Sequence, residues 1–330
     1  MLFNRNNKKS EQPDIPNRVE ALPVRRPGSF IAAVFVLILA AMLVKGLVTN
    51  ENFEWNVVWK YIFNENIISG IGWTLVITAL SMVIATALSV ILAVMRESAN
   101  PVLRFVSWFY IWFFRGTPVY TQLVFWGLFT VLIPRVSLGI PFTDVTFWSC
   151  DSQDLMTAFN AAVIGLSLNE SAYLAEIVRA GLEAVDPGQS EAAKALGMSH
   201  SQIMRRVILP QAMRIIVPPM GNEAIGMLKT TSLVLAVLFT LDLQFASNAI
   251  ANRLYKPIPL LLVACIWYLL ITSVLMVLQR MLEKHYGKGF DANFAGEKGK
   301  DSEHLPGKTM GEVKNDINKT NEATLAGLNA

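Results

Sequence analysis

Long apolar runs, separated by polar segments, dominate this sequence of 330 residues. A helix needs about 20 apolar residues to cross the hydrocarbon core of a bilayer, and several of the runs reach that length. Charged residues make up 16% of the chain, whereas a soluble protein carries about 25%. The sequence therefore predicts an all-α integral membrane protein with about six transmembrane helices. The apolar stretches are 30–48, 73–94, 105–133, 155–177, 211–241 and 257–282.

The remaining segments are polar, and their composition predicts how the chain is divided. Prolines and cations at the N-terminus are typical of a disordered arm, and no small-residue cleavage site suggests a signal peptide. Residues 134–154 are polar, and residues 242–256 are expected to form a loop. The predicted domains are a disordered arm (1–28), an extra transmembrane helix with an external segment (29–66), a main transmembrane domain (67–285) and a disordered tail (286–330).

The distribution of Lys and Arg predicts which side of the membrane each segment faces, because cytoplasmic segments carry an excess of these residues. With a cytoplasmic N-terminus, the inner side holds the cations of the arm together with Arg96, Arg104, Arg179, Lys194, Arg205, Arg206, Arg214, Arg280 and Lys284. The outer side then holds only Lys60, Arg135, Arg253 and Lys256, beyond the border residue Lys45. We therefore expect both termini and the polar segment 191–210 on the cytoplasmic side.

The segment 191–210 and the residues before it predict two short helices. Asp186 and Pro187 are typical of a helix start, since Asp caps free N–H groups and Pro suits the first turn. Gly197 suits the left-handed conformation that ends a helix. The first helix would present a small, flat surface with an acid where the helix dipole favours one. The residues of this surface are Glu191, Ala192, Ala193, Ala195 and Leu196.

The second helix of the segment is amphipathic. Ser199 or Ser201 can cap it, and Pro210 is expected to separate it from the next span. Two short helices with a small-residue surface suit insertion into a groove on another protein. The alternative is an amphipathic loop that packs on its own helical bundle, and the residues alone leave both interpretations open.

Several motifs together resemble the permease subunits of ABC importers, in the branch that carries polar amino acids. The run EAAKALG (191–197), followed by ILP (208–210), is similar to their EAA coupling motif, although the residue usually found between Ile and Leu-Pro is absent. Thr230 stands where an acid is common in this branch. The other motifs are FRGTP (114–118), AYLAEIVRAG (172–181), GQ (188–189), PP (218–219), NE (222–223) and KTTSL (229–233), and the resemblance covers 67–285.

This resemblance implies a type I ABC importer permease fold, with a five-helix core and one N-terminal helix, in the bacterial cytoplasmic (inner) membrane. The expected partners are cytoplasmic ABC ATPase subunits, a second permease subunit, an extracytoplasmic solute-binding protein, the lipid bilayer and a small polar amino acid of the histidine, glutamine, glutamate or arginine kind; no nucleic acid is expected. The partner ATPase would use ATP and Mg, and this chain would bind no cofactor. The residues expected to couple to the ATPase are Glu191, Ala192, Ala193, Ala195, Leu196, Gly197 and Pro210.

The chain itself is not expected to be an enzyme. The nearest approach to a nucleotide site is the run 221–230, but its Lys229 is misplaced for a P-loop, which needs Gly-Lys-Ser/Thr together. Cys150 and Cys265 lie far apart, and no Cys/His cluster suggests a metal site.

Polar residues interrupt the fourth and fifth apolar stretches, where charge is costly unless it faces a cavity or a partner. A zwitterionic amino acid needs donors for its carboxylate, such as Lys229, and acceptors for its ammonium group, such as Glu170 or Glu223. From the sequence alone, a structural role and a contact with the solute are equally plausible for Glu170. If its side chain faces the pathway, it would favour a solute with a cationic side chain. The candidate pathway residues are Glu170, Tyr173, Asn222, Glu223, Lys229 and Thr230.

Three further charged residues are candidates for gating or for locking helices. Glu176 and Arg179 are three apart and can pair, and we favour a structural role for them. Arg115 lies where Gly and Pro can bend the third stretch, and it needs an acid or carbonyl partner unless it snorkels to the interface. The fifth stretch is expected to kink at 218–219 and to break at 230–232.

The leading hypothesis is the permease subunit of an ATP-driven importer of polar amino acids, which forms the solute pathway and couples it to a separate ATPase. An ion-coupled secondary amino acid transporter is the alternative, with Glu170 and Glu223 as proton carriers. Six spans without an internal inverted repeat argue against it. A membrane scaffold or channel subunit would leave 191–210 dispensable for transport.

Overall fold

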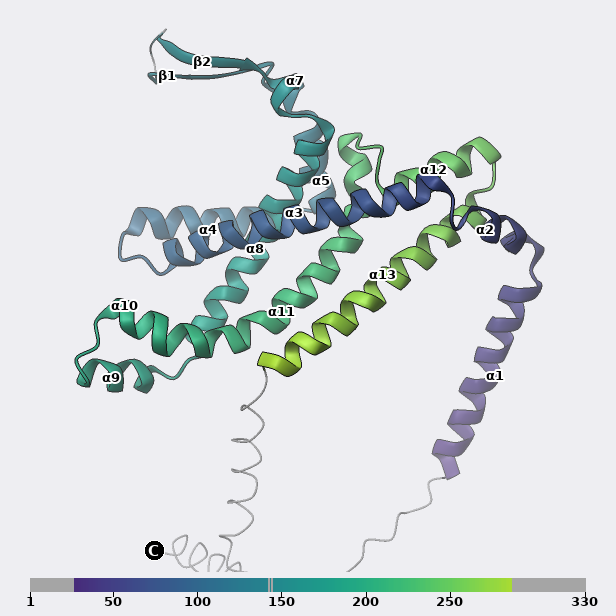
Figure 1. Cartoon of the computed structure of the whole chain (residues 1–330), viewed down its shortest axis with the longest axis horizontal. Coiled ribbons are helices and arrows are strands. Elements are labelled where there is room, and N and C mark those ends of the chain that lie inside the picture. The colour runs from purple at the N-terminus through teal and green to yellow at the C-terminus, as the bar shows by residue number, and fades with distance from the viewer. Residues whose placement is uncertain (1–26, 142, 144, 287–330) are drawn as a thin grey trace, which may run out of the picture. The chain divides into compact units, whose positions relative to one another are not determined.

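The computed structural model describes residues 27–141, 143 and 145–286, so most of the predicted arm and the tail from 287 lie outside the described residues (Figure 1). The chain divides into two compact units, of which the first ends at Phe53 and the second begins at Glu54. Within the described residues, the first unit holds α1 (Pro27–Thr49) and a 3₁₀ turn (Glu51–Phe53). Every described side chain of α1 is exposed, as suits an apolar helix surrounded by lipid.

The second unit is mainly helical. Its helices are α2 (Trp55–Tyr61), α3 (Glu65–Arg96), α4 (Pro101–Gly116), α5 (Val119–Gly127), α6 (Phe129–Leu132), α7 (Ser152–Leu155), α8 (Ala158–Glu183), α9 (Pro187–Ala195), α10 (His200–Ile203), a π-helical segment (Met204–Ile208), α11 (Leu209–Thr230), a 3₁₀ segment (Thr231–Val237), α12 (Leu243–Leu254) and α13 (Pro257–Tyr286). Among the described residues, four helices are long and apolar enough to cross a membrane, namely α1, α3, α8 and α13.

The third apolar stretch is divided between α4 and α5. α4 ends at Gly116 and α5 begins at Val119, with Thr117 extended because the residue before a proline is pushed out of the α region. The break frees the carbonyl oxygens of Phe114 and Thr117, and the side-chain amide of Gln122 donates to both, at 3.0 and 3.1 Å. Irregular backbone at membrane depth requires such partners.

The fifth apolar stretch is divided between α11 and the 3₁₀ segment. The predicted break at 230–232 is confirmed, because 3₁₀ geometry begins at Thr231. The hydroxyl of Thr231 donates to the carbonyl oxygen of Leu228 at 2.7 Å, which satisfies a backbone group beside the break. α11 itself remains helical through the two prolines at 218–219.

α8 is the central helix of the second unit and the most buried of the four apolar helices. It packs against α3, α4, α5 and α11, and its buried face is rich in small residues that let neighbouring backbones approach closely. A Cβ atom added to Gly181 would lie 2.2 Å from Cγ1 of Ile216 in α11. The Tyr110 hydroxyl of α4 lies 2.9 Å from the carbonyl oxygen of Leu168 and donates to it.

The segment 242–256 contains a helix, so the prediction of a loop there was wrong. Asp242 caps α12, because its Oδ2 atom accepts hydrogen bonds from the backbone N–H groups of Gln244 and Phe245. Tyr255 ends the helix in a left-handed conformation. The capping acid and the three- and four-residue spacing of the buried side chains were the signals for this helix. Those buried residues are Leu243, Ala246, Ser247, Ile250 and Ala251.

The polar segment 134–154 contains an antiparallel hairpin of β1 (Arg135–Gly139) and β2 (Thr146–Asp151), which was not predicted from the sequence. Leu138 pairs with Trp148, and Arg135 pairs with Asp151 through both backbone register and a 3.1 Å ion pair. The strands are too short for their alternation of apolar and polar residues to stand out in the sequence. The fold is therefore helical except for this hairpin within the described residues.

Candidate functional site

The segment 186–210 folds as a hairpin of two short helices, α9 and α10, as the sequence predicted. Asp186 caps α9, because its Oδ1 atom accepts a hydrogen bond from the backbone N–H of Gly188 at 2.7 Å. Ser199 and Gln202 cap α10 reciprocally, since each side chain accepts a hydrogen bond from the backbone N–H of the other residue. These caps fix where each helix begins.

Gly197 forms the turn between the two helices. Its φ angle of 75° lies in the left-handed region, which costs residues with a side chain about 1–2 kcal/mol. The N–H groups of Gly197 and Met198 donate to the carbonyl oxygens of Lys194 and Ala193, at 2.9 and 3.1 Å, and so close the end of α9. A Cβ atom added to Gly197 would meet nothing within 4 Å, so the turn is open on its outer side.

The outer surface of the α9–α10 hairpin is not covered by the described part of the chain. α9 packs mainly on α10 and on the π-helical segment, and Ala193 is the buried member of its small-residue surface. Glu191, Ala192 and Ala195 are exposed, and Leu196 at the tip is 82% exposed. An exposed leucine among small residues favours docking into a partner over packing on its own bundle.

Pro210 does not separate α10 from the next span, so this prediction was wrong. Helical structure is continuous from α10 through the π-helical segment into α11 (Figure 1). The N–H of Leu209 donates to the carbonyl oxygen of Met204, five residues earlier, and this wider turn accommodates the proline in the first turn of α11. The α9–α10 hairpin is therefore joined to α11 without an intervening loop.

A cavity of 240 Å³ lies between α8 and α11. α8 contributes Asn169, Glu170 and Tyr173 to its lining, and α11 contributes Glu223 and Thr230. Four of the predicted pathway residues therefore meet at one place, from two helices far apart in the sequence. The lining combines two carboxylates with an amide, a phenol and a hydroxyl, so it offers both acceptors and donors to a polar solute.

Glu170 is the group in this cavity that most needs a partner. Its residue is 7% exposed, and its Oε1 atom accepts no hydrogen bond from the described residues. A buried ionised carboxylate without a partner costs several kcal/mol, and Glu223 lines the same cavity. A cationic group placed between the two would compensate both carboxylates.

The break between α4 and α5 borders this cavity. Val119, the first residue of α5, lines it, and the side-chain amide of Asn169 donates to the carbonyl oxygen of Phe114 at 3.0 Å. The guanidinium carbon of Arg115 lies 5.3 Å from the centroid of the Tyr173 ring, which is a cation–π contact. The sequence predicted an acid or a carbonyl group as the partner of Arg115. In the structure its partner is the aromatic ring of Tyr173, which also lines the cavity.

The predicted pair between Glu176 and Arg179 is confirmed, with 2.9 Å between Oε2 and Nη2. Glu183, which sequence reasoning missed, adds a second ion pair to Arg179 at 2.5 Å. Its spacing of four residues along α8 was the available signal. All three side chains are partly or largely exposed, so the cluster locks successive turns of α8 with a modest energy.

The model of one protein family, the binding-protein-dependent transport system inner membrane component, matches residues 85–288. The chain belongs to this family. It is 51% identical over 275 residues to the arginine transport system permease protein ArgU of Corynebacterium glutamicum, covering 83% of this chain and 85% of that protein. It is 36% identical over 225 residues to the histidine/lysine/arginine/ornithine transport system permease protein HisM of Salmonella typhimurium, covering 66% of this chain and 88% of that protein.

Solved structures agree with this family. A crystal structure of an amino acid ABC transporter with histidines is 34% identical, with a TM-score of 0.57, and covers 71% of this chain and 98% of its own. An inward-facing methionine ABC transporter, MetNI, shares the fold at 19% identity and a TM-score of 0.51. The fold is therefore that of an ABC importer permease, and membership of a binding-protein-dependent family favours ATP-driven import over the ion-coupled alternative.

Two of the predicted pathway residues of this permease lie outside the cavity. The Oδ1 atom of Asn222 accepts a hydrogen bond from the side-chain amide of Gln279 in α13 at 2.8 Å. Lys229 is exposed on α11 and does not line the cavity. Their place in the solute pathway stays a prediction. The sequence prediction also left out Asn169, which lines the cavity. The signal for it was a side-chain amide within an apolar stretch.

In the part of the chain that the structure describes, no group of three His, Cys, Asp or Glu residues is placed to hold a metal ion. Cys150 and Cys265 are free thiols. Members of this permease family are transport components rather than catalysts, and the use of ATP and Mg by a separate ATPase stays an expectation for this system.

Proposed function

We propose that this chain is the membrane-spanning permease subunit of an ATP-driven importer of amino acids, and that it favours amino acids with a cationic side chain. The observation that carries the proposal is the buried carboxylate of Glu170, which has no partner among the described residues and lines one cavity with Glu223. ArgU and HisM, both named for transport systems that carry arginine, support the same class of solute.

The size and lining of the cavity suit a single amino acid. Drug-sized ligands occupy about 300–1,000 Å³, so a volume of 240 Å³ favours a smaller solute. A guanidinium or ammonium side chain would pair with Glu170, since a charge-assisted hydrogen bond at a dry site is among the stronger ones. The hydroxyl of Tyr173 is the neutral donor offered to the carboxylate of the solute, because the amide of Asn169 already donates to Phe114 and Gln122 and the hydroxyl of Thr230 to Gly226.

The α9–α10 hairpin is the proposed docking element for a cytoplasmic ATPase subunit. Its small-residue surface and Leu196 are exposed, and its helical structure continues into α11, which supplies Glu223 and Thr230 to the cavity. ATP-driven closure of the ATPase pair would thus bias α11 and the cavity wall toward one of two access states, as a ligand shifts a conformational equilibrium.

The complete transporter would contain two permease subunits, two ATPases and an extracytoplasmic solute-binding protein. The second permease is a copy of this chain or a paralogue. The family description names binding-protein dependence, which supports the external partner. The proposed location is the bacterial inner membrane, with several spans and both termini in the cytoplasm, in agreement with the excess of Lys and Arg on that side.

The test is transport by the complete complex in proteoliposomes, with labelled arginine and glutamine compared at equal concentrations. Glu170→Gln keeps the size of the side chain and removes its charge. A hydrogen bond to a charged group contributes about 1.5–3 kcal/mol, so we expect arginine uptake to fall about 10- to 100-fold and glutamine uptake to change much less. Glu176→Gln, which loses a paired acid outside the cavity, is the control and should affect both solutes equally.

Two results would contradict the proposal. Equal loss of arginine and glutamine uptake in Glu170→Gln would show that Glu170 does not select the solute. The proposal of an ATP-driven importer would still stand. Uptake driven by a proton gradient, without ATP and without partner subunits, would contradict the ATP-driven mechanism itself.

A further inference from the structure

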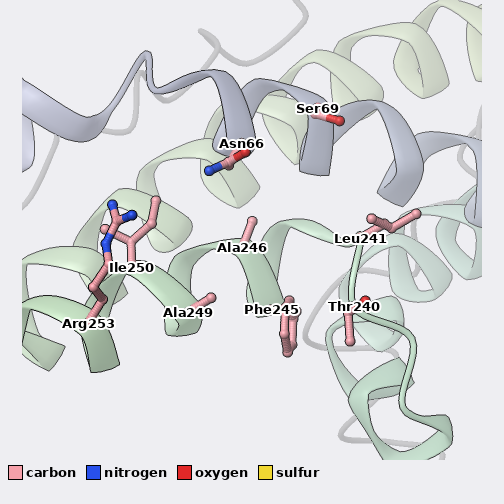
Figure 2. A pocket seen from close by; sticks show the side chains of 9 residues that line it. All are labelled: Asn66, Ser69, Thr240, Leu241, Phe245, Ala246, Ala249, Ile250 and Arg253. Atoms are coloured by element: carbon pink, nitrogen blue, oxygen red, sulfur yellow. The ribbon is translucent and has the colours of Figure 1, made fainter.

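A groove of 370 Å³ lies between α12 and the beginning of α3, in the second unit of the chain. Figure 2 shows Asn66 and Ser69 of α3 facing the side chains of α12 across the groove, with Arg253 at one end and Thr240 at the other. Phe245 of α12 adds an apolar surface between these ends. The distribution of Lys and Arg predicts this part of the chain to be external.

The groove is held in shape by close backbone packing. A Cβ atom added to Gly70 of α3 would lie 2.9 Å from the Cα atom of Leu243, so the two helices touch backbone to backbone. The N–H of Leu243 donates to the hydroxyl of Thr74 at 3.1 Å, and Asp242 caps α12. Leu243 and Ile250 are buried in a core shared with α2 and α13. A partner would therefore bind a preformed surface, with little cost of ordering it.

Arg253 differs from the other predicted external cations in its surroundings. Lys60 lies 5.7 Å from the centroid of the Tyr61 ring, and Arg135 pairs with Asp151. Lys256 pairs with Glu54. Arg253, by contrast, is exposed and makes no ion pair or hydrogen bond with any residue that the structure describes.

The lining of the groove adds no acid to neutralise this charge. Its other side chains are neutral, and Asn66, Ser69 and Thr240 offer hydrogen bonds around an apolar floor. The unpaired charge of Arg253 makes this surface poorly suited to lipid tails. Five of the nine lining residues are apolar and four are polar, and such a mixture with an exposed arginine is common at transient protein interfaces.

We propose that this groove docks the extracytoplasmic solute-binding protein, which places an Asp or Glu side chain beside Arg253. The inference rests on the proposed function, because a solute-binding protein delivers its solute from the external side, and the family description names binding-protein dependence. An acidic partner supplies the carboxylate that Arg253 lacks, and opposite charge speeds a short-lived encounter. The groove next to α12 is then the place where delivery begins.

The test uses the complete transporter in nanodiscs and its arginine-loaded solute-binding protein. Stimulation of ATP hydrolysis is measured as a function of the binding-protein concentration at two salt concentrations. For Arg253→Glu, we expect the half-maximal concentration to rise at least about tenfold at low salt, and less at high salt because ions screen the contact. Lys60→Glu reverses an external cation outside the groove and should stay within twofold of the unmodified chain.

A second measurement identifies what occupies the groove without a change of charge. Ala249, which is exposed and lines the groove, is changed to Cys in a chain whose Cys150 and Cys265 are Ser, and a photo-crosslinker is attached. A crosslink to the solute-binding protein supports the proposal, and a crosslink to the second permease subunit or to lipid overturns it. If the unmodified complex is not stimulated by its binding protein, the proposed function fails. If the unmodified complex is stimulated and Arg253→Glu has the same half-maximal concentration of binding protein, only the docking proposal fails.

Discussion

Leu196, at the tip of the α9–α10 hairpin, gives a direct test of docking to the ATPase. Its residue is 82% exposed in this chain, whereas a groove on the partner would bury it. Full burial of a leucine side chain contributes about 1.5–3 kcal/mol, and alanine retains only the Cβ atom of that side chain. We therefore expect Leu196→Ala to weaken the complex by about 1–2 kcal/mol, which is about a 5- to 30-fold loss of affinity.

The assay titrates a fluorescently labelled ATPase subunit onto the permease in nanodiscs. Leu138→Ala is the matched control, because Leu138 is 63% exposed but lies on β1, outside the hairpin. Both substitutions remove an exposed side chain, so the melting temperature of either variant should change by at most about 2 °C. Equal affinities for Leu196→Ala and Leu138→Ala would refute the docking of this tip.

Three other predictions concern the turn, the packing and the pH dependence. Gly197→Asp should abolish coupled ATP hydrolysis without affecting membrane insertion, because its φ of 75° disfavours a side chain on the docking surface; normal coupling would contradict docking. Gly181→Ala should lower the melting temperature, since its Cβ would meet Ile216 at 2.2 Å, whereas Gly72→Ala, with nothing within 4 Å, should not; equal shifts would contradict the close packing of α8 on α11. Burial raises the pKa of Asp242 to about 6, so its neutral form stabilises the fold and this contribution is lost as the pH rises from about 4 through 6. The melting temperature of Asp242→Asn, which keeps a capping side chain, should fall less over that range, and parallel curves would argue against a buried acid.

The features that the sequence predicted well are those that depend on neighbouring residues. Asp186, Gly197 and Ser199 act through their own backbone or the next few residues, so their residue types identified both helix starts and the turn. The break before Pro118 is equally local, because a proline restricts the residue before it. Length and hydropathy likewise identified the apolar helices, since the bilayer sets the length of a span.

The features that the sequence predicted wrongly or missed depend on contacts between distant segments. α12 was missed because its buried stripe becomes visible only when Leu243 and Ile250 pack in the core with α2 and α13. On α11, the neighbouring stripes Asn222–Lys229 and Glu223–Thr230 are equally plausible from spacing, and packing against α8 turns the second toward the cavity. Helical spacing gives a face, but the rotation of that helix is set by its neighbours.

Pro210 shows how a single wrong boundary changes the mechanism. A loop at this residue would have let the docking hairpin move independently of the spans. In the structure, helical geometry continues from α10 to Thr230, so the run from residue 200 to Glu223 is about 35 Å of helix at 1.5 Å per residue. In the proposed mechanism, a displacement of the hairpin would be carried along one helix to the cavity wall. The π-helical segment lies at one end of α11 and the 3₁₀ break after Thr230 at the other, and irregular turns of this kind can absorb a displacement. In the proposed mechanism α11 would therefore move between these two turns, while Glu170 would remain on the buried helix α8.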